Sequence, residues 1–162
     1  MNIPGEGLKG VYGANEYLTR TNLMKAYLPD SKTPIKKSKT VAVVGGGNTA
    51  MDAARAALRA GAKSSTLVYR RTKKYMPADA EELEMAIADG VEFLELVAPV
   101  EQKDGKLICE KMKLGDPDDK GRRKPVPTGE MVEIPCDTVV SAVGEKVESE
   151  VFTRNGITVD ED

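Results

Sequence analysis

The feature that most constrains the fold is a run of three glycines placed between an apolar segment and a helical one. Residues Thr40–Val44 form a short run rich in β-branched side chains, which predicts a strand buried on both faces. The glycines follow at positions 45–47, and residues 48–60 then show the apolar spacing of a helix, with Gly61 placed to end it. A buried strand, a tight turn and a helix in this order are typical of an α/β fold with a parallel sheet.

Within this turn, the spacing Gly45-x-Gly47-x-x-Ala50 gives each position a physical task. Gly45 allows the sharp turn off the strand, and Gly47 has no side chain that would keep a diphosphate away from the backbone. Ala50 is small enough for the helix to lie close to the strand. Phosphate groups would then meet free N–H groups and the positive end of the helix dipole. We therefore predict a dinucleotide site here, against the alternative of an ordinary glycine-rich turn.

The end of the second predicted strand, residues 66–69, indicates which dinucleotide this is. An NAD site has Asp or Glu at this point, about 20 residues after the glycines, to accept a hydrogen bond from the ribose 2′-OH. This chain has Arg70 and Arg71 instead. Two guanidinium groups suit a 2′-phosphate, which they can hold through charge-assisted bonds. The pattern favours NADP(H), and the alternative is a solvated basic loop.

The remaining patterns place further elements around this unit. Residues 15–28 have helical spacing, with Pro29 after them, and Asp79 and Glu82 resemble a capping box that opens a helix ended by Gly90. That helix is expected to turn Ala80, Leu83 and Ile87 inward. A third strand over 91–96 precedes a hairpin over 99–114, a polar loop over 115–129 and a short strand over 131–134. The buried-type run 137–143 returns to the sheet and ends at Gly144. We expect Gly144 and Glu145 to lie near the bound cofactor, and the alternative is a plain turn. The predicted fold class is α/β: a Rossmann-like parallel sheet with an antiparallel β-meander after the third strand.

Composition restricts the chemistry that this chain can perform. The 162 residues suffice for one domain, and they include no histidine, which excludes His-based catalysis and His metal ligation. Cys109 and Cys136 are too few and too far apart for an iron–sulfur cluster, a zinc ribbon or a Cys-x-x-Cys pair, and we expect both to be reduced, a bridge between them being the alternative. Tyr69 and Lys73 have the spacing of a short-chain reductase pair but lie where the ribose phosphate belongs. We therefore expect no catalytic residue and no metal site.

The charge balance and the start of the chain limit its partners and its location. The 24 basic and 26 acidic residues give a net charge of −2, so no global positive field attracts nucleic acid or membranes. No apolar run approaches the ~18 residues of a membrane helix, and residues 1–6 lack the pattern of a signal peptide. We expect a cytoplasmic protein with no nucleic-acid or membrane partner.

Taken together, these motifs resemble those of a known family. Residues 41–55 combine the strand and the three glycines with Asn-Thr-Ala-Met-Asp-Ala-Ala-Arg, 68–72 read Val-Tyr-Arg-Arg-Thr, and 76–78 read Met-Pro-Ala. This set resembles the NADPH-binding domain of the glutamate synthase small-subunit family, in the pyridine nucleotide–disulfide oxidoreductase superfamily. Within the family, residues 69–79 and 142–147 look closest to the selenate reductase iron–sulfur subunit.

The resemblance implies a site and a domain arrangement. It implies diphosphate contact by Gly45, Gly47, Asn48, Thr49 and Ala50, with Gly46 in the same turn, and 2′-phosphate contact by Arg70 and Arg71. In the family, the NADPH domain is inserted into a split FAD domain, behind an iron–sulfur domain. By analogy, residues 1–39 are a crossover segment from the FAD domain, 40–145 the NADP(H)-binding domain, and 146–162 the start of the return to the FAD domain.

The function implied is therefore that of a part. We expect an NADP(H)-binding domain of a larger FAD and iron–sulfur oxidoreductase that presents the nicotinamide for hydride transfer to FAD. FAD and the clusters would be bound largely outside this chain, and the partners would be the FAD domain of the same polypeptide and an electron-accepting subunit. The isolated chain would bind NADP(H) without turnover. The alternative is a non-catalytic Rossmann domain that senses a nucleotide or docks a partner.

Overall fold

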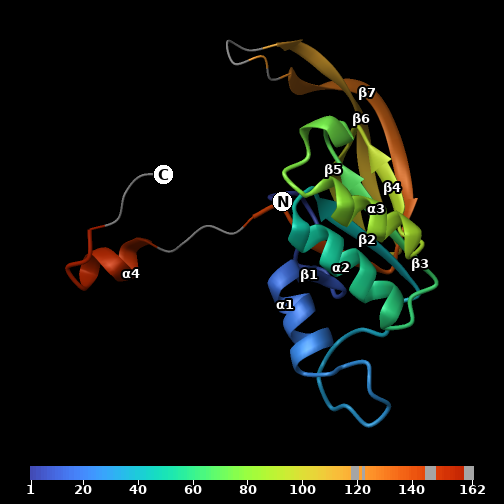
Figure 1. Cartoon of the computed structure of the whole chain (residues 1–162), viewed down its shortest axis with the longest axis vertical. Helices are drawn as coiled ribbons and strands as arrows, with labels where there is room; N and C mark the ends of the chain where they lie inside the picture. The colour runs from blue at the N-terminus through green and yellow to red at the C-terminus, as the bar shows by residue number, and fades with distance from the viewer. Residues whose placement is uncertain (118–120, 122, 145–148, 159–162) are drawn as a thin grey trace.

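Two sheets in adjoining layers make up the centre of the molecule, a computed structural model that describes residues 1–117, 121, 123–144 and 149–158 (Figure 1). The larger sheet has five strands in the order β1-β8-β2-β3-β4, and each neighbouring pair is parallel. Its strands are β1 (Val11–Gly13), β2 (Thr40–Gly45), β3 (Ser64–Tyr69), β4 (Glu92–Glu95) and β8 (Thr138–Ala142). The central position of β2 explains its apolar composition, because a strand covered on both faces has no solvent side.

Helices cover one face of the parallel sheet, and the sequence of α2 (Asn48–Arg59) explains how closely it lies. Four of its alanines are fully buried together with Met51, and they pack against Val41, Val43 and Leu67 of the sheet. Alanine side chains keep the helix axis close to the strands, so the glycine turn before α2 has to be tight. α3 (Ala80–Ala88) packs beside α2 and completes this layer.

An antiparallel sheet covers the opposite face. It contains β5 (Val97–Lys103), β6 (Lys106–Pro117) and β7 (Arg123–Pro135), in that order. Apolar side chains from the two sheets meet in a second core, made of Ala42, Val44, Val68 and Val139 on one side and Val97, Leu107, Cys109 and Ile134 on the other. The parallel sheet therefore lies between helices and a meander, which confirms the predicted fold class.

The N-terminal region differs from the prediction in two respects. The expected helix over 15–28 is shorter: α1 (Ala14–Leu18) continues into the wider π-helical turn η1 (Thr19–Leu23) and ends there. Lys25 has a φ of +52°, which turns the chain, and Met24, Tyr27 and Leu28 after the helix are exposed, whereas Tyr17 is buried. In addition, residues 11–13, for which the sequence predicts no strand, form β1, which pairs with β8 at the edge of the parallel sheet.

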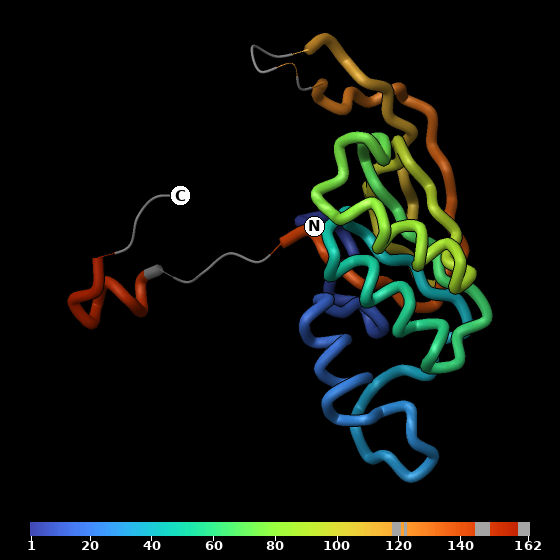
Figure 2. Tube along the Cα trace, viewed as in Figure 1, coloured from blue at the N-terminus to red at the C-terminus, as the bar shows by residue number. Residues whose placement is uncertain are grey.

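The polar loop expected over 115–129 is mostly strand. β6 runs to Pro117 and β7 starts at Arg123, and the register pairs Met112 with Pro127 and Leu114 with Pro125. β7 is an edge strand, so some of its backbone positions face away from β6 and need no N–H donor for the ladder. Proline, which has no backbone N–H, is tolerated at such positions. The two strands form an arm that projects beyond the parallel sheet (Figure 2).

The capping box expected at α3 is only partly present. Asp79 occupies the N-cap position, but its carboxylate makes no capping bond, and Glu82 lies near Arg55 instead of reaching back. The inward face of α3 consists of Leu83 and Ala86, whereas Ala80 and Ile87 are exposed. Gly61 and Gly90 end their helices as predicted, both with a φ of +98°. α4 (Ser149–Arg154) lies apart from both sheets (Figure 1), and no helix among the described residues is long and apolar enough to span a bilayer.

An ion pair between α2 and α3 provides a test of their packing. Arg55 donates from Nε to Oδ2 of Asp89 at 2.7 Å, and this bond holds the pKa of the Asp89 carboxyl below its ordinary value of about 4. A lowered pKa means stability that is present above pH 4 and lost as the carboxylate is protonated on further acidification. We expect Asp89→Asn to be less stable than the wild type at pH 7 in urea unfolding, and the difference to shrink progressively as the pH is lowered below about 4. Glu84→Gln, an exposed change on the same helix, is the control and should show a smaller difference at pH 7.

Candidate functional site

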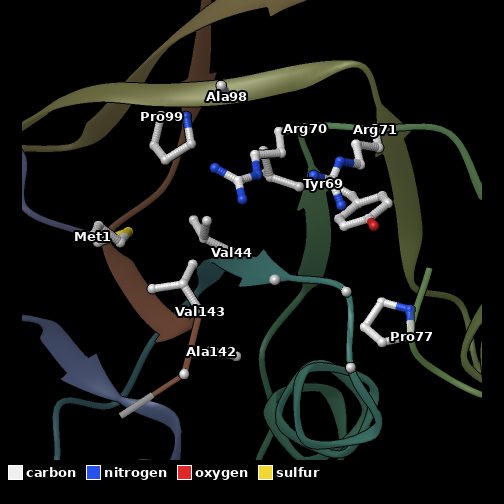
Figure 3. A pocket seen from close by; sticks show the side chains of 15 residues that line it. Met1, Val44, Tyr69, Arg70, Arg71, Pro77, Ala98, Pro99, Ala142 and Val143 are labelled. Atoms are coloured by element: carbon white, nitrogen blue, oxygen red, sulfur yellow. The ribbon is translucent and has the colours of Figure 1, made fainter. Parts of the chain in front are cut away.

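A cavity of about 630 Å³ lies at the carboxyl ends of β2, β3 and β8, the edge where open parallel sheets bind ligands (Figure 3). The meander forms one of its walls, because β5 passes over it. The lining residues are Met1, Val44, Gly45, Gly46, Gly47, Val68, Tyr69, Arg70, Arg71, Pro77, Ala98, Pro99, Ala142, Val143 and Gly144.

The glycines of the turn meet different surroundings. Gly45 has a φ of +154°, and a Cβ placed on it would lie 2.5 Å from the carbonyl oxygen of Ala142 on the adjacent strand. A Cβ on Gly46 would lie 2.3 Å from the ring of Tyr69. Among the described residues, none places an atom within 4 Å of a Cβ on Gly47. The first two glycines are therefore demanded by the protein itself, whereas Gly47 leaves space open to a ligand.

The start of α2 offers backbone donors to that space. Gly47 is the N-cap residue, and the first-turn N–H groups of Asn48 and Thr49 have no acceptor within the helix. These groups and the helix dipole favour an anion at this point. The side chain of Asn48 is engaged with Asp79, and Ala50 is fully buried against the sheet, where its small size serves the packing of the helix.

The two arginines follow β3 and enter the cavity from the side opposite β8. Figure 3 shows the Arg70 guanidinium reaching over Val44 towards Pro99, while Arg71 lies above the ring of Tyr69. Arg70 is exposed and Arg71 is half-buried. The Nε of Arg71 is a buried donor without a partner in the described part of the chain. Such a donor is costly unless an acceptor satisfies it, so it points to an anionic ligand.

The structure thus brings together most of the site residues that the sequence predicts. Gly45, Gly46, Gly47, Arg70, Arg71 and Gly144 all line one cavity, Asn48 and Thr49 are exposed beside it, and Glu145 lies outside the described residues. Sequence reasoning missed the apolar walls contributed by Tyr69, Pro77, Ala98, Pro99 and Val143. The pairing of β5 with the rest of the meander brings Ala98 and Pro99 to the cavity, and no local pattern indicates this.

The described lining of the cavity combines glycines and apolar side chains with Tyr69 and two arginines. Among the described residues that line the cavity there is no carboxylate and no thiol, and the Tyr69 hydroxyl donates to the carbonyl oxygen of Tyr75 at 2.7 Å. Both cysteines are free and buried between the sheets, where burial raises the pKa of Cys109 to about 12 and that of Cys136 to about 11. They stay protonated and are not nucleophiles at neutral pH. The described residues contain no group of side chains that could hold a metal ion.

The sequence of this chain is similar to a known protein family and to several known oxidoreductases. The family described as pyridine nucleotide-disulphide oxidoreductase matches residues 1–162. The chain is 42% identical over 175 residues to the beta subunit of the NADP(+)-dependent formate dehydrogenase of Moorella thermoacetica, covering 99% of this chain and 24% of that protein. It is 48% identical over 157 residues to the beta subunit of the NADPH-Fe(3+) oxidoreductase of Geobacter sulfurreducens, covering 90% and 22%.

A third relative is the small chain of the NADPH glutamate synthase of Halomonas elongata, 38% identical over 168 residues, which cover 98% of this chain and 35% of that protein. The chain therefore spans about a third or less of the length of these relatives. Among solved structures, FprA of Mycobacterium tuberculosis in complex with NADPH has a TM-score of 0.69 at 21% identity, over 90% of this chain and 47% of that one. Thioredoxin reductase of T. acidophilum has a TM-score of 0.69 at 18% identity, over 99% and 45%. Both solved structures have the same fold as this chain over the aligned residues.

Proposed function

Because the chain belongs to the pyridine nucleotide-disulphide oxidoreductase family, we propose that it is the NADP(H)-binding domain of a longer flavin-dependent oxidoreductase. Its task is to hold the dinucleotide so that the nicotinamide faces an FAD bound outside this chain. When bound, NADPH supplies the hydride, and the residues of this chain bind and orient it.

The observation that carries the proposal is that the glycine turn and both arginines line one and the same cavity. The glycine turn and the start of α2 supply backbone donors for a diphosphate, and Arg70 and Arg71 supply two positive charges for a 2′-phosphate. The fit is supported by the open space at Gly47 and by the unpartnered Nε of Arg71. The volume of about 630 Å³ lies within the ~300–1,000 Å³ range of cofactor sites.

The place of this domain in a larger assembly is part of the proposal. The relatives named above are subunits or chains of NADPH- or NADP(+)-dependent oxidoreductases, and each is far longer than the aligned segment. We propose that residues 1–39 and 146–162 connect to an FAD domain, and that iron–sulfur clusters and an electron-accepting subunit complete the enzyme. The most specific part of the proposal is that the parent protein resembles the iron–sulfur subunit of selenate reductase. The motifs at 69–79 and 142–147 support this subfamily assignment.

Titration of the purified chain with NADPH and with NADH tests this function directly. We expect calorimetry to show one site, with a Kd for NADPH at least about tenfold lower than that for NADH, because only NADPH carries the 2′-phosphate that the arginines can hold. Bound NADPH should not be oxidised in the absence of an added flavoprotein. Equal Kd values for the two nucleotides would overturn the 2′-phosphate assignment, and no binding of either would overturn the function.

A further inference from the structure

The loop between β3 and α3 is tied to the glycine turn by hydrogen bonds from side chains that the proposed function leaves without a role. The Asn48 side chain donates from Nδ2 to Oδ2 of Asp79 at 3.1 Å, and its Oδ1 accepts from the backbone N–H of Asp79 at 3.0 Å. This reciprocal pair joins the first residue of α2 to the N-cap of α3, which lie 31 residues apart in the sequence.

Two further bonds connect the same parts of the molecule. The backbone N–H of Ala78 donates to the carbonyl oxygen of Gly46 at 3.0 Å, so the loop binds the glycine turn itself. The Tyr69 hydroxyl donates to the carbonyl oxygen of Tyr75 at 2.7 Å, while its ring fills the space over Gly46. Figure 3 shows Tyr69 and Pro77 together at this rim of the cavity.

The loop also carries the two arginines at its start. Arg71 is anchored to the end of β4, because its carbonyl oxygen accepts from the N–H of Leu96 at 3.1 Å. The loop is thus attached to the sheet at one end and to the glycine turn at the other. The separation between the arginines and the backbone donors of α2 depends on both attachments.

We infer that Asn48 is a positioning residue. Its two hydrogen bonds with Asp79, which we call the clamp, hold the loop that begins with Arg70 and Arg71 at a fixed distance from the start of α2. That distance matches the separation of the diphosphate and the 2′-phosphate in one NADPH. This inference rests on the proposed function. The inference has different consequences for the two nucleotides. NADH needs only the glycine turn for binding, whereas NADPH needs the glycine turn and the loop at the correct separation. Loss of the clamp should therefore reduce the preference for NADPH and leave the diphosphate subsite intact.

The test compares variants of the clamp in the whole chain by calorimetry with NADPH and NADH. We expect Asn48→Ala, which removes both bonds, to raise the Kd for NADPH about tenfold and that for NADH less than about twofold. Asp79→Ala removes one bond and should have a smaller effect. Asp79→Asn keeps an acceptor for Asn48 and should retain the preference, although it removes the same negative charge as Asp79→Ala.

The control is Arg59→Gln, which breaks a contact between the same two helices at their other end, where Arg59 Nη2 lies 3.2 Å from Asp89. It should leave both Kd values within about twofold, because an exposed pair contributes little to the fold. Hydrogen exchange at the Ala78 amide reports on the loop without any nucleotide. This amide is bonded to Gly46 and not to Asn48, and we expect it to exchange about tenfold faster in Asn48→Ala.

The outcomes distinguish a failure of the clamp inference from a failure of the proposed function. An equal loss of affinity for both nucleotides in Asn48→Ala would overturn the clamp, because Asn48 would then act at the diphosphate or on the fold. Unchanged exchange at Ala78 would overturn it too, whatever the nucleotide data. A wild-type chain that binds neither nucleotide would instead overturn the proposed function, and thermal unfolding of each variant identifies any that fails to fold.

Discussion

Replacing both Arg70 and Arg71 with alanine is expected to raise the Kd for NADPH about 100-fold and to change the Kd for NADH less than about threefold. The two guanidinium groups line the cavity, and a hydrogen bond to a charged group contributes about 1.5–3 kcal/mol. Two such bonds to the 2′-phosphate, discounted for the exposure of Arg70, correspond to a factor of this size. NADH lacks the phosphate and loses no such bond.

The single variants should differ, because the two side chains differ in surroundings. Arg71 is half-buried with an unpartnered Nε, so a phosphate bond made there is shielded from water, and Arg71→Ala is expected to cost more affinity than Arg70→Ala. Lys73→Ala with Lys74→Ala is the matched control, since it removes two nearby charges that do not line the cavity. If this control lowers NADPH affinity as much as the arginine pair does, the basic loop attracts anions in general and the assignment of the arginines is wrong.

The parts of the site that the sequence predicts are those in which one local pattern carries the whole physical argument. The apolar run before Gly45 predicts β2, and the apolar spacing over residues 48–60 predicts the helix α2. Arg70 and Arg71 line the same cavity as the glycines because they follow β3, which pairs in parallel with β2.

The parts that were missed depend on contacts between segments far apart in the sequence. Strand β1 has three residues, and pairing with β8 more than 100 positions later is what makes it a strand. The wall of the cavity at Ala98 and Pro99 depends on Leu96, whose φ of +57° turns the chain out of the parallel sheet into the meander. A leucine is rarely found in this conformation, so no propensity indicates the turn.

The clamp shows the same limit at the scale of two side chains. The family resemblance implies that Asn48 contacts the diphosphate, and the local pattern makes Asp79 the first residue of a capping box. In the structure they bond to each other, because the starts of α2 and α3 lie side by side above the sheet. Local capping rules cannot anticipate a partner that tertiary packing brings within reach.

Gly45→Ala is expected to be the most destabilising substitution in the glycine turn. It places a Cβ 2.5 Å from a backbone oxygen of β8, at a φ of +154° that side-chain-bearing residues rarely adopt. Backbone strain and overpacking together cost about 2–4 kcal/mol, which corresponds to a fall in Tm of about 5–15 °C for a chain of this size. β2 and β8 must separate to relieve the contact, because the neighbouring atom belongs to backbone. Thermal unfolding followed by circular dichroism measures the change.

Gly47→Ala, two residues later, separates the fold from the binding site. Its Cβ would meet no atom of the described part of the chain within 4 Å, and its φ of −96° suits alanine, so the free energy of unfolding should change by less than about 1 kcal/mol. The same Cβ would project into the space where the diphosphate is expected, so the Kd values for NADPH and NADH should both rise about tenfold. Wild-type affinity in Gly47→Ala would show that the diphosphate lies elsewhere in the cavity.

A stable Gly45→Ala would show that β2 and β8 can move apart, and the close approach at the turn would then not account for the glycine.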